Sequence, residues 1–506
     1  MKRFFCAVSA GDYHTMQSAI YTLEKGGNAF DAAVSSFFTA CLAELPLTSP
    51  AGGGYLTYFD AKTKDIKYYD FFVNVPSEDS KEKNFYPVNV DFKSAVQTFH
   101  VGYASTAVPG NLAGILTIHQ EKGCLPLSDC LEYPIKLAEQ GFYISPFISY
   151  VINDLLAPIF LATEESKKQF VINGTLLNDK TFFKNFEYAN FLKTLIKKGA
   201  DIFYNGELAD QIEFIYSKNG GLLQKSDLMS YAVEHNTPLT ISLDGYELHL
   251  LFKSSIGGML LYFSFKFLEK YNHISKNFLL DLVEVIKETS LFRNYFFKEE
   301  NLDLFINISK EHYLDFINRY LSDKKDLGNT THFSIVDKDH NAVSCTTSNG
   351  EGCGVVIPNT GFMMNNMLGE EDLNFFGFFN WPKNKRLFSM MSPTIITKNG
   401  EFYLALGSAG SNRIRSAILN TIYNFIVKKL SLEKSINSPR IHFENNIVYY
   451  EQGFPKEFIK EIEEQYDTVK FDEFNMYFGG VHAAGKDFAA SDTRRNGHHK
   501  VIKHSS

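Results

Sequence analysis

Cysteine is scarce in this sequence. The 506 residues include six cysteines, with no CxxC pair and no Cys/His cluster that has the spacing of zinc ligands. They are Cys6, Cys41, Cys124, Cys130, Cys345 and Cys353. This usage favours free, mostly buried thiols in a reducing compartment. We also expect no metal site.

Long apolar runs, internal repeats and low-complexity tracts are missing as well. Because no run of 18 apolar residues is present, we expect no transmembrane helix. The first residues, MKRFFCAVSAG, resemble a signal peptide, but their apolar part spans only about six or seven residues, which is short for such a segment. A buried first strand is the better interpretation, and we predict a cytoplasmic protein.

Positively charged residues are fewer than negatively charged ones in this sequence. Lys and Arg number 50 against 58 Asp and Glu, which gives a formal net charge of −8 and a pI near 6.0. This balance argues against nucleic acid or an anionic membrane as the main partner.

The residue patterns predict mainly helices in the earlier part of the chain and mainly strands in the later part. Residues 13–25 have apolar side chains at helical spacing, and Asn28 suits the N-cap of a second, almost wholly apolar helix. Patterns from about 110 to 325 are mainly helical, whereas strand-like segments dominate after 330, with Asn399-Gly400 as a hairpin turn. This order lacks strict alternation and favours an α+β fold of stacked layers.

The stretch TTHFSIVDKDHNAVSCTTS, residues 330–348, is typical of a β-hairpin. Two alternating apolar segments flank a polar turn whose midpoint is Asp339. A symmetric hairpin sets Ser348 opposite Thr330, with the β-carbons about 5 Å apart. A slip of one residue would place Thr347 or Asn349 there instead.

Two interpretations fit these paired hydroxyls. One is a cross-strand hydrogen bond at a solvated strand end. The other is a threonine nucleophile with a supporting hydroxyl. Such a threonine needs a base to remove its proton. No Ser/His/Asp spacing and no G-x-S-x-G motif in the sequence supplies that base. An α-amine with a pKa near 7.7–8.0 would serve as the base of Thr330, provided that the Asn329–Thr330 peptide bond is cut.

Several segments, in order, resemble the gamma-glutamyltransferase family of N-terminal nucleophile hydrolases. They include LEKGGNAFDAAV, SPAGGGYLTYFDAKT, AVPGNLAG, NTTHFSIVDKDHNAVS, RLFSMMSPTIITKNGEFYLALGSAGSNRI and AASDTRR. The resemblance implies a four-layer αββα sandwich and self-cleavage between Asn329 and Thr330. The large segment, 1–329, and the small segment, 330–506, would remain one structural domain, as a heterodimer with a possible further oligomer.

The resemblance also implies a reaction. Thr330 would attack a γ-glutamyl amide of a glutathione-like compound, and water or an amine would resolve the acyl-enzyme without a cofactor. Ser348 stands where the family usually has a second threonine, and Gly410 and Ser411 stand at its oxyanion hole. From the residues alone, the loop GSAGSN is also compatible with phosphate binding, but it lacks the Gly-Lys-Ser/Thr ending of such loops.

Substrate recognition departs from the family pattern. Phe72 stands in place of the arginine that grips the glutamyl carboxylate, and phenylalanine cannot replace a bidentate guanidinium. Met367 and Met390 stand at two further polar positions of the family. The remaining candidates for substrate binding are Asn349, Glu370, Ser389 and Arg413. Arg413 could equally be a solvated residue at a helix start, and the acidic run around Glu370 a solvated face.

Two alternatives therefore stay open beside a γ-glutamyl hydrolase or transferase. The chain could cleave a different amide with the same fold, as an acylase or a poly-γ-glutamate hydrolase does, or it could be a pseudoenzyme that only binds γ-glutamyl compounds.

Overall fold

The computed structural model describes residues 5–79, 82–91, 96–271, 277–296, 330–374 and 377–503. Asn329, on the amino side of the predicted cleavage point, lies outside the described residues. All six cysteines are free, and all but Cys124 are buried, as the sequence predicts. No helix in the described part of the chain has the length and apolarity needed to cross a membrane.

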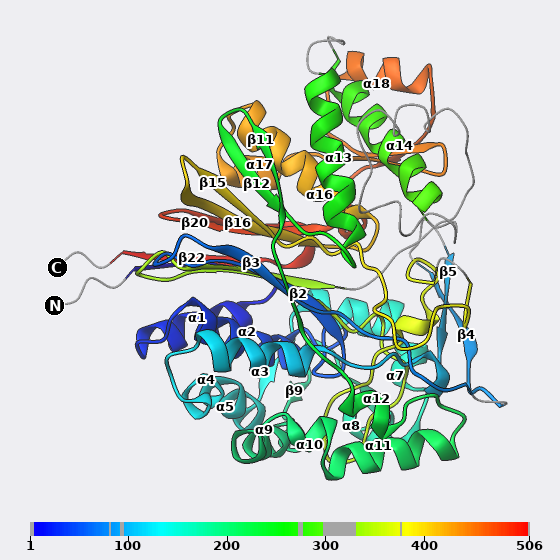
Figure 1. Cartoon of the computed structure of the whole chain (residues 1–506). Helices are drawn as coiled ribbons and strands as arrows, with labels where there is room; N and C mark the ends of the chain where they lie inside the picture. Colours follow the sequence, from blue (N-terminus) through cyan, green and yellow to red (C-terminus); the bar gives the residue numbers. More distant parts are fainter. Residues whose placement is uncertain are drawn as a thin grey trace.

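Two β-sheets are stacked at the centre of the molecule (Figure 1). The first has the strand order β10-β3-β2-β14-β13-β1-β22 and the second the order β11-β12-β15-β16-β20-β21. The strands of the first sheet are β1 (Phe5–Ala10), β2 (Gly53–Phe59), β3 (Ile66–Phe71), β10 (Glu234–Asn236), β13 (Thr331–Val336), β14 (Ala342–Ser348) and β22 (His498–Lys503). Those of the second are β11 (Leu239–Leu243), β12 (Tyr246–Leu250), β15 (Thr394–Lys398), β16 (Glu401–Ala409), β20 (Gly480–Gly485) and β21 (Ala489–Ser491).

Helices cover the outer face of each sheet (Figure 1). On the first sheet these are α1 (Tyr13–Glu24), α2 (Ala29–Ala43) and α3 (Asn111–Lys122). On the second they are α13 (Ile256–Tyr271) and α16 (Arg413–Ile422), with α14 (Phe278–Phe296) beside α13. The expected four-layer αββα sandwich is therefore confirmed.

Shorter elements complete the layers. The further helices are α4 (Leu127–Cys130), α5 (Glu132–Gln140), α6 (Pro146–Tyr150), α7 (Ala157–Phe160), α8 (Glu164–Phe170), α9 (Phe186–Lys198), α10 (Asp201–Tyr204), α11 (Glu207–Lys218), α12 (Lys225–Met229), α17 (Leu432–Ile436) and α18 (Lys456–Glu463). Small sheets pair β4 (Tyr86–Asp91) with β5 (Val96–Val101), β6 (Phe142–Tyr143) with β9 (Phe182–Phe183), β7 (Val171–Ile172) with β8 (Thr175–Leu176), and β18 (Ile447–Glu451) with both β17 (Ile441–Glu444) and β19 (Asp467–Phe471).

Local sequence signals explain several of these elements. The Asn28 side chain accepts from the backbone N–H groups of Phe30 and Asp31, and Asp31 accepts in return from the backbone of Asn28, a capping box that starts α2. Asn399 and Gly400 have φ values of 53° and 74°, as a tight turn between β15 and β16 requires. The first strand, β1, is buried and lies between β13 and β22.

The hairpin of β13 and β14 has the register that its symmetry predicts. Thr331 pairs with Thr347 and Val336 with Ala342, so the pairs are centred on Asp339. One further step in this register sets Thr330 opposite Ser348. The two strands lie in the middle of the first sheet, between β1 and β2.

A tight contact joins this hairpin to the second sheet. The buried His332 ring on β13 hydrogen-bonds the Thr346 and Ser334 hydroxyls, at 2.8 and 2.9 Å. Gly407 on β16 faces this ring, and a β-carbon added to Gly407 would lie 2.4 Å from the ring atom Cε1. The absence of a side chain at residue 407 therefore lets the two sheets approach at this point.

Substitution Gly407→Ala should destabilise the fold by about 1–3 kcal/mol, because the added methyl group would displace the buried His332 ring, which is hydrogen-bonded at both nitrogens. Urea unfolding followed by circular dichroism measures this change. An unchanged unfolding midpoint would contradict the described contact between the sheets.

Candidate functional site

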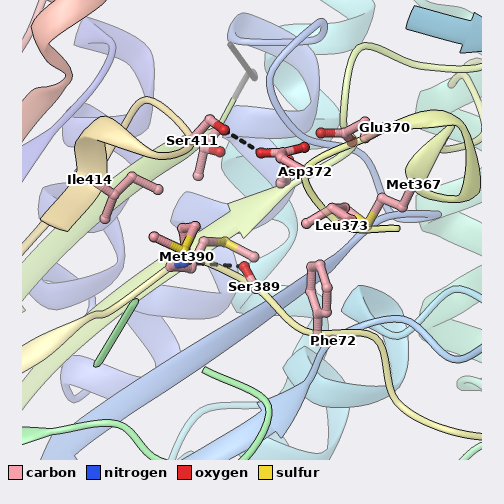
Figure 2. A pocket seen from close by; sticks show the side chains of 12 residues that line it. Phe72, Met367, Glu370, Asp372, Leu373, Ser389, Met390, Ser411 and Ile414 are labelled. Atoms are coloured by element: carbon pink, nitrogen blue, oxygen red, sulfur yellow. Dashed lines mark hydrogen bonds between the residues drawn. The ribbon is translucent and has the colours of Figure 1, made fainter. Parts of the chain in front are cut away.

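A small pocket opens where the β13–β14 hairpin meets the second sheet. It encloses about 320 Å³, including its open mouth. It is lined by Phe72, Thr330, Ser348, Met367, Glu370, Asp372, Leu373, Ser389, Met390, Met391, Ser411 and Ile414 (Figure 2). These residues are far apart in the sequence, and both sides of the predicted cleavage point contribute to the pocket.

Thr330 and Ser348 line the pocket together, as the hairpin register predicts. Thr330 directly precedes β13 and is only 5% exposed, so the interpretation as a solvated strand end does not hold. The Ser348 hydroxyl accepts a hydrogen bond of 3.0 Å from the backbone N–H of Gly350. This bond orients the hydroxyl at the end of β14.

A buried acid supports the strand behind Thr330. Glu44, at the C-cap of α2, accepts hydrogen bonds from the hydroxyls of Thr331 at 2.5 Å and Thr15 at 2.7 Å. Burial, together with the nearby charge of Asp12, raises the pKa of Glu44 from its usual 4.5 to about 8. Burial likewise raises the pKa of Asp12 to about 6. This network was not predicted from the sequence, in which the second threonine of TTHF was the available signal.

The loop after β16 has the backbone geometry of a glycine-rich turn. Gly410 and Ser411 have φ values of 117° and 48°, both in the left-handed region. A β-carbon at Gly410 would lie 2.8 Å from the Gly479 Cα, so that position has no space for a side chain. Ser411 lines the pocket and donates a hydrogen bond to Asp372, which stabilises this unusual backbone (Figure 2). That the backbone N–H groups of residues 410 and 411 form an oxyanion hole stays a prediction.

Two of the four predicted substrate-binding residues, Glu370 and Ser389, line the pocket. The buried Asn349 does not, and its amide donates to the backbone carbonyls of Met363 and Met364, at 3.3 and 3.4 Å. It lies next to the pocket-lining Ser348 and supports the loop that follows β14.

Arg413 lies away from the pocket lining. Its guanidinium is 3.6 Å from the Glu444 carboxylate, donates to the Tyr477 carbonyl and lies over the Tyr477 ring at 4.6 Å. Because α16 begins at residue 413, this side chain leaves the helix on the face that packs against β17, whereas Ile414 faces the pocket. Arg413 is therefore not among the described residues that line the pocket, and its assignment to substrate binding stays a prediction.

The three departures from the family pattern converge in space. Phe72, Met367 and Met390 all line the pocket, and the Phe72 ring stacks on Tyr55 with ring centroids 5.7 Å apart. Asp372 also lines the pocket and was missed, although it belongs to the same acidic run as Glu370. The pocket thus combines hydroxyls, two carboxylates and an apolar wall.

Among the described residues, one group of side chains of the types that can bind a metal lies outside the pocket. Ligand atoms of Asp31, His119 and Cys130 lie within 4.8 Å of one another. The Asp31 carboxylate already accepts from the backbone N–H groups of Asn28, Cys124 and Leu125. These bonds tie the start of α2 to the segment after α3, which is a sufficient structural role for the acid.

The family model for gamma-glutamyltranspeptidase matches residues 16–502 of this chain. The chain belongs to the gamma-glutamyltranspeptidase family. The resemblance in the sequence motifs is thereby confirmed.

Relatives of the chain carry different names. The chain is 28% identical to the glutathione hydrolase proenzyme of Bacillus subtilis (strain 168), over 94% of this chain and 88% of the relative. It is also 28% identical to the Acylase ACY 1 proenzyme of Pseudomonas sp. (strain SE83), over 86% and 82%. The structure of cephalosporin acylase from Bacillus halodurans shares the fold, with a TM-score of 0.80 over 98% of this chain and 96% of that one, at 18% identity.

Substitution Glu44→Gln should remove a pH dependence of stability. Since the folded-state pKa of Glu44 is raised to about 8 from a usual 4.5, the folded state holds a proton that the unfolded state releases. The free energy of unfolding should therefore fall by a few kcal/mol as the pH rises from 5 to 8, and the Gln variant, which stays neutral, should lose most of this fall.

Urea unfolding at several pH values measures the effect. Substitution of the exposed Glu24, for which no such burial applies, is the matched control. Equal pH slopes in the Glu44→Gln variant and the unsubstituted protein would contradict the assignment.

Proposed function

We propose that the chain cuts itself before Thr330 and then cleaves γ-glutamyl-type amides through an ester on the Thr330 hydroxyl. The observation that carries this proposal is the position of Thr330. It is buried, it lines the pocket beside Ser348, and it directly precedes a strand held on both sides by neighbouring strands. A nucleophile on a rigid element is held in one geometry during the reaction.

Self-cleavage would generate the catalytic base. The Thr330 oxygen loses its proton as it attacks the carbonyl carbon of Asn329, the peptide C–N bond breaks as its nitrogen gains a proton, and water then hydrolyses the resulting ester. The products are the segments 1–329 and 330–506, and the second begins with a free α-amine. An α-amine has a pKa near 7.7–8.0 and so can accept a proton near neutral pH. The word proenzyme in the names of the relatives supports this step.

Substrate cleavage would follow the same chemistry. The α-amine of Thr330 takes the hydroxyl proton as its oxygen bonds to the substrate carbonyl carbon, and the proton passes to the leaving nitrogen as the C–N bond breaks. In this proposal, the backbone N–H groups of Gly410 and Ser411 receive the developing oxyanion. Loss of one such donor typically costs about 2.7–4 kcal/mol of activation free energy. Water completes hydrolysis, and an amine completes transfer.

A second candidate is the cleavage of a different amide by the same machinery. The apolar side chains of Phe72, Met367 and Met390 in the pocket favour it, because none of them can bind the polar groups of a glutamyl moiety. Relatives named acylase support it as well. Both candidates share the nucleophile and differ only in the acyl group.

Substitution Thr330→Ala should abolish cleavage and turnover together. Denaturing electrophoresis should show one full-length band, and γ-glutamyl-p-nitroanilide should release no p-nitroaniline. Thr330→Ser, which keeps a hydroxyl, is the matched control and should be cleaved more slowly than the unsubstituted protein. Release of p-nitroaniline by the Ala variant would overturn the assignment of the nucleophile.

A further inference from the structure

The Phe72 ring forms part of the pocket wall, so its position affects how much space an acyl group has. In Figure 2 the ring lies on the lower side of the pocket, together with Ser389 and Met390. The ring stacks on Tyr55, with ring centroids 5.7 Å apart and planes 17° apart. Because Tyr55 is fully buried, it supports the Phe72 ring from the interior of the protein.

Hydrogen bonds hold the Phe72 backbone at both its N–H and its carbonyl group. The Asp70 carboxyl group accepts from the Phe72 N–H at 3.0 Å. The Phe72 carbonyl accepts from the Tyr231 hydroxyl at 2.6 Å and also from the Arg386 guanidinium. Asp70, Tyr231 and Arg386 together form the Phe72 clamp. This clamp leaves the Phe72 backbone little freedom to shift.

The members of the Phe72 clamp also contact one another. Arg386 donates to the Tyr231 hydroxyl, lies over the Tyr231 ring at 4.9 Å and lies 3.4 Å from the Asp70 carboxyl group. The Ser254 hydroxyl donates to the other oxygen of Asp70, and the Tyr55 hydroxyl lies 3.0 Å from that of Ser254. One buried network therefore holds both the Phe72 backbone and the ring on which Phe72 stacks.

The clamp also fixes Phe72 relative to the rest of its side of the pocket. Arg386 belongs to the small segment and is followed closely by Ser389 and Met390, whereas Asp70 and Tyr231 belong to the large segment. A backbone hydrogen bond of 3.0 Å joins residues 387 and 73 beside the clamp. Contacts between the two segments thus set the distance from the Phe72 ring to its neighbours in the pocket.

A wall that is held in this way limits the size of the acyl group. An acyl group that is too large for the pocket must either displace the clamped ring or bind less well. One surplus methylene group in an apolar pocket typically changes kcat/KM by about 10- to 200-fold. If the ring were free to shift, the pocket would adapt and the discrimination would be smaller.

We propose that the Phe72 clamp sets the size limit of the acyl group, with Asp70, Tyr231 and Arg386 as positioning residues that act through Phe72. The proposal rests on the proposed function, because it concerns the acyl group that Thr330 receives. None of the three clamp residues is among the described residues that line the pocket, so they do not act by touching the acyl group.

Four p-nitroanilides in two pairs measure the size limit. One pair is γ-glutamyl and its homologue δ-(α-aminoadipyl), and the other is butanoyl and pentanoyl. The members of a pair carry the same charges and differ by one methylene group. The ratio of kcat/KM between them does not depend on the amount of folded enzyme, which cancels. We expect the unsubstituted protein to favour the shorter member of the better-cleaved pair by about tenfold or more.

Two substitutions test the clamp. Tyr231→Phe and Arg386→Met should each lower this ratio about threefold or more, since a loosened ring discriminates less. Denaturing electrophoresis should still show self-cleavage in both variants. Lys385→Met, the same change at the exposed neighbouring residue, is the matched control and should leave the ratio unchanged. Tyr231→Phe removes a single hydroxyl and decides the question if Arg386→Met does not fold.

A double variant tests whether the clamp acts through Phe72. Phe72→Ala should lower the ratio by itself, because it removes the ring from the wall. Addition of Tyr231→Phe to that variant should change the ratio no further. A further fall in the double variant would contradict the proposed action through Phe72.

The outcomes separate this inference from the proposed function. A ratio near one in the unsubstituted protein, or an unchanged ratio in the Tyr231→Phe variant, would overturn the inference and leave the threonine mechanism in place. If none of the four compounds releases p-nitroaniline and intact mass spectrometry finds no acyl group on the small segment, the proposed function and the inference with it are overturned.

Discussion

The site depends on the pairing of β13 with β14 in the middle of the first sheet. This ladder sets Thr331 against Thr347, and β1 and β2 hold the two strands from outside. Hydrogen bonds on several strands fix the position of a residue that lies one step beyond the paired strands. Thr330 and Ser348 therefore face each other because of the sheet. The buried acid Glu44 adds a contact from the helix layer to the neighbouring Thr331. Thr330 is thus positioned by the fold itself.

The parts of the fold that could be predicted are those encoded by neighbouring residues. The polar turn DKDHN has an obvious centre, and a hairpin that is symmetric about it has the register observed. The sequence alone left a slip of one residue open, and the paired strands resolve it. Asn28 and Asp31 lie three residues apart and cap α2 by contacts within one turn. The positive φ angles of Asn399 and Gly400 follow from the same local chemistry.

The parts that could not be predicted depend on distant segments. Glu44 and Thr331 are separated by 287 residues, and nothing in either neighbourhood shows that they meet. The sequence shows that Arg413 begins a helix, but the face on which its side chain leaves that helix is set by packing against β17. Phe72, Met367 and Met390 were recognised as separate departures from a pattern, and only the folded chain shows that they line the same pocket.

The strand order of the first sheet interleaves the two predicted segments. From one edge, β10, β3 and β2 belong to the large segment, β14 and β13 to the small one, β1 again to the large one and β22 to the small one. Neither segment can complete this sheet alone, so a cut before Thr330, as proposed, would require the intact chain to fold first. After the cut, renaturation would require two separate molecules to meet, and its rate would depend on protein concentration. A cleaved enzyme of this kind would stay folded because it unfolds slowly, since an unfolded copy in dilute solution could not readily reassemble.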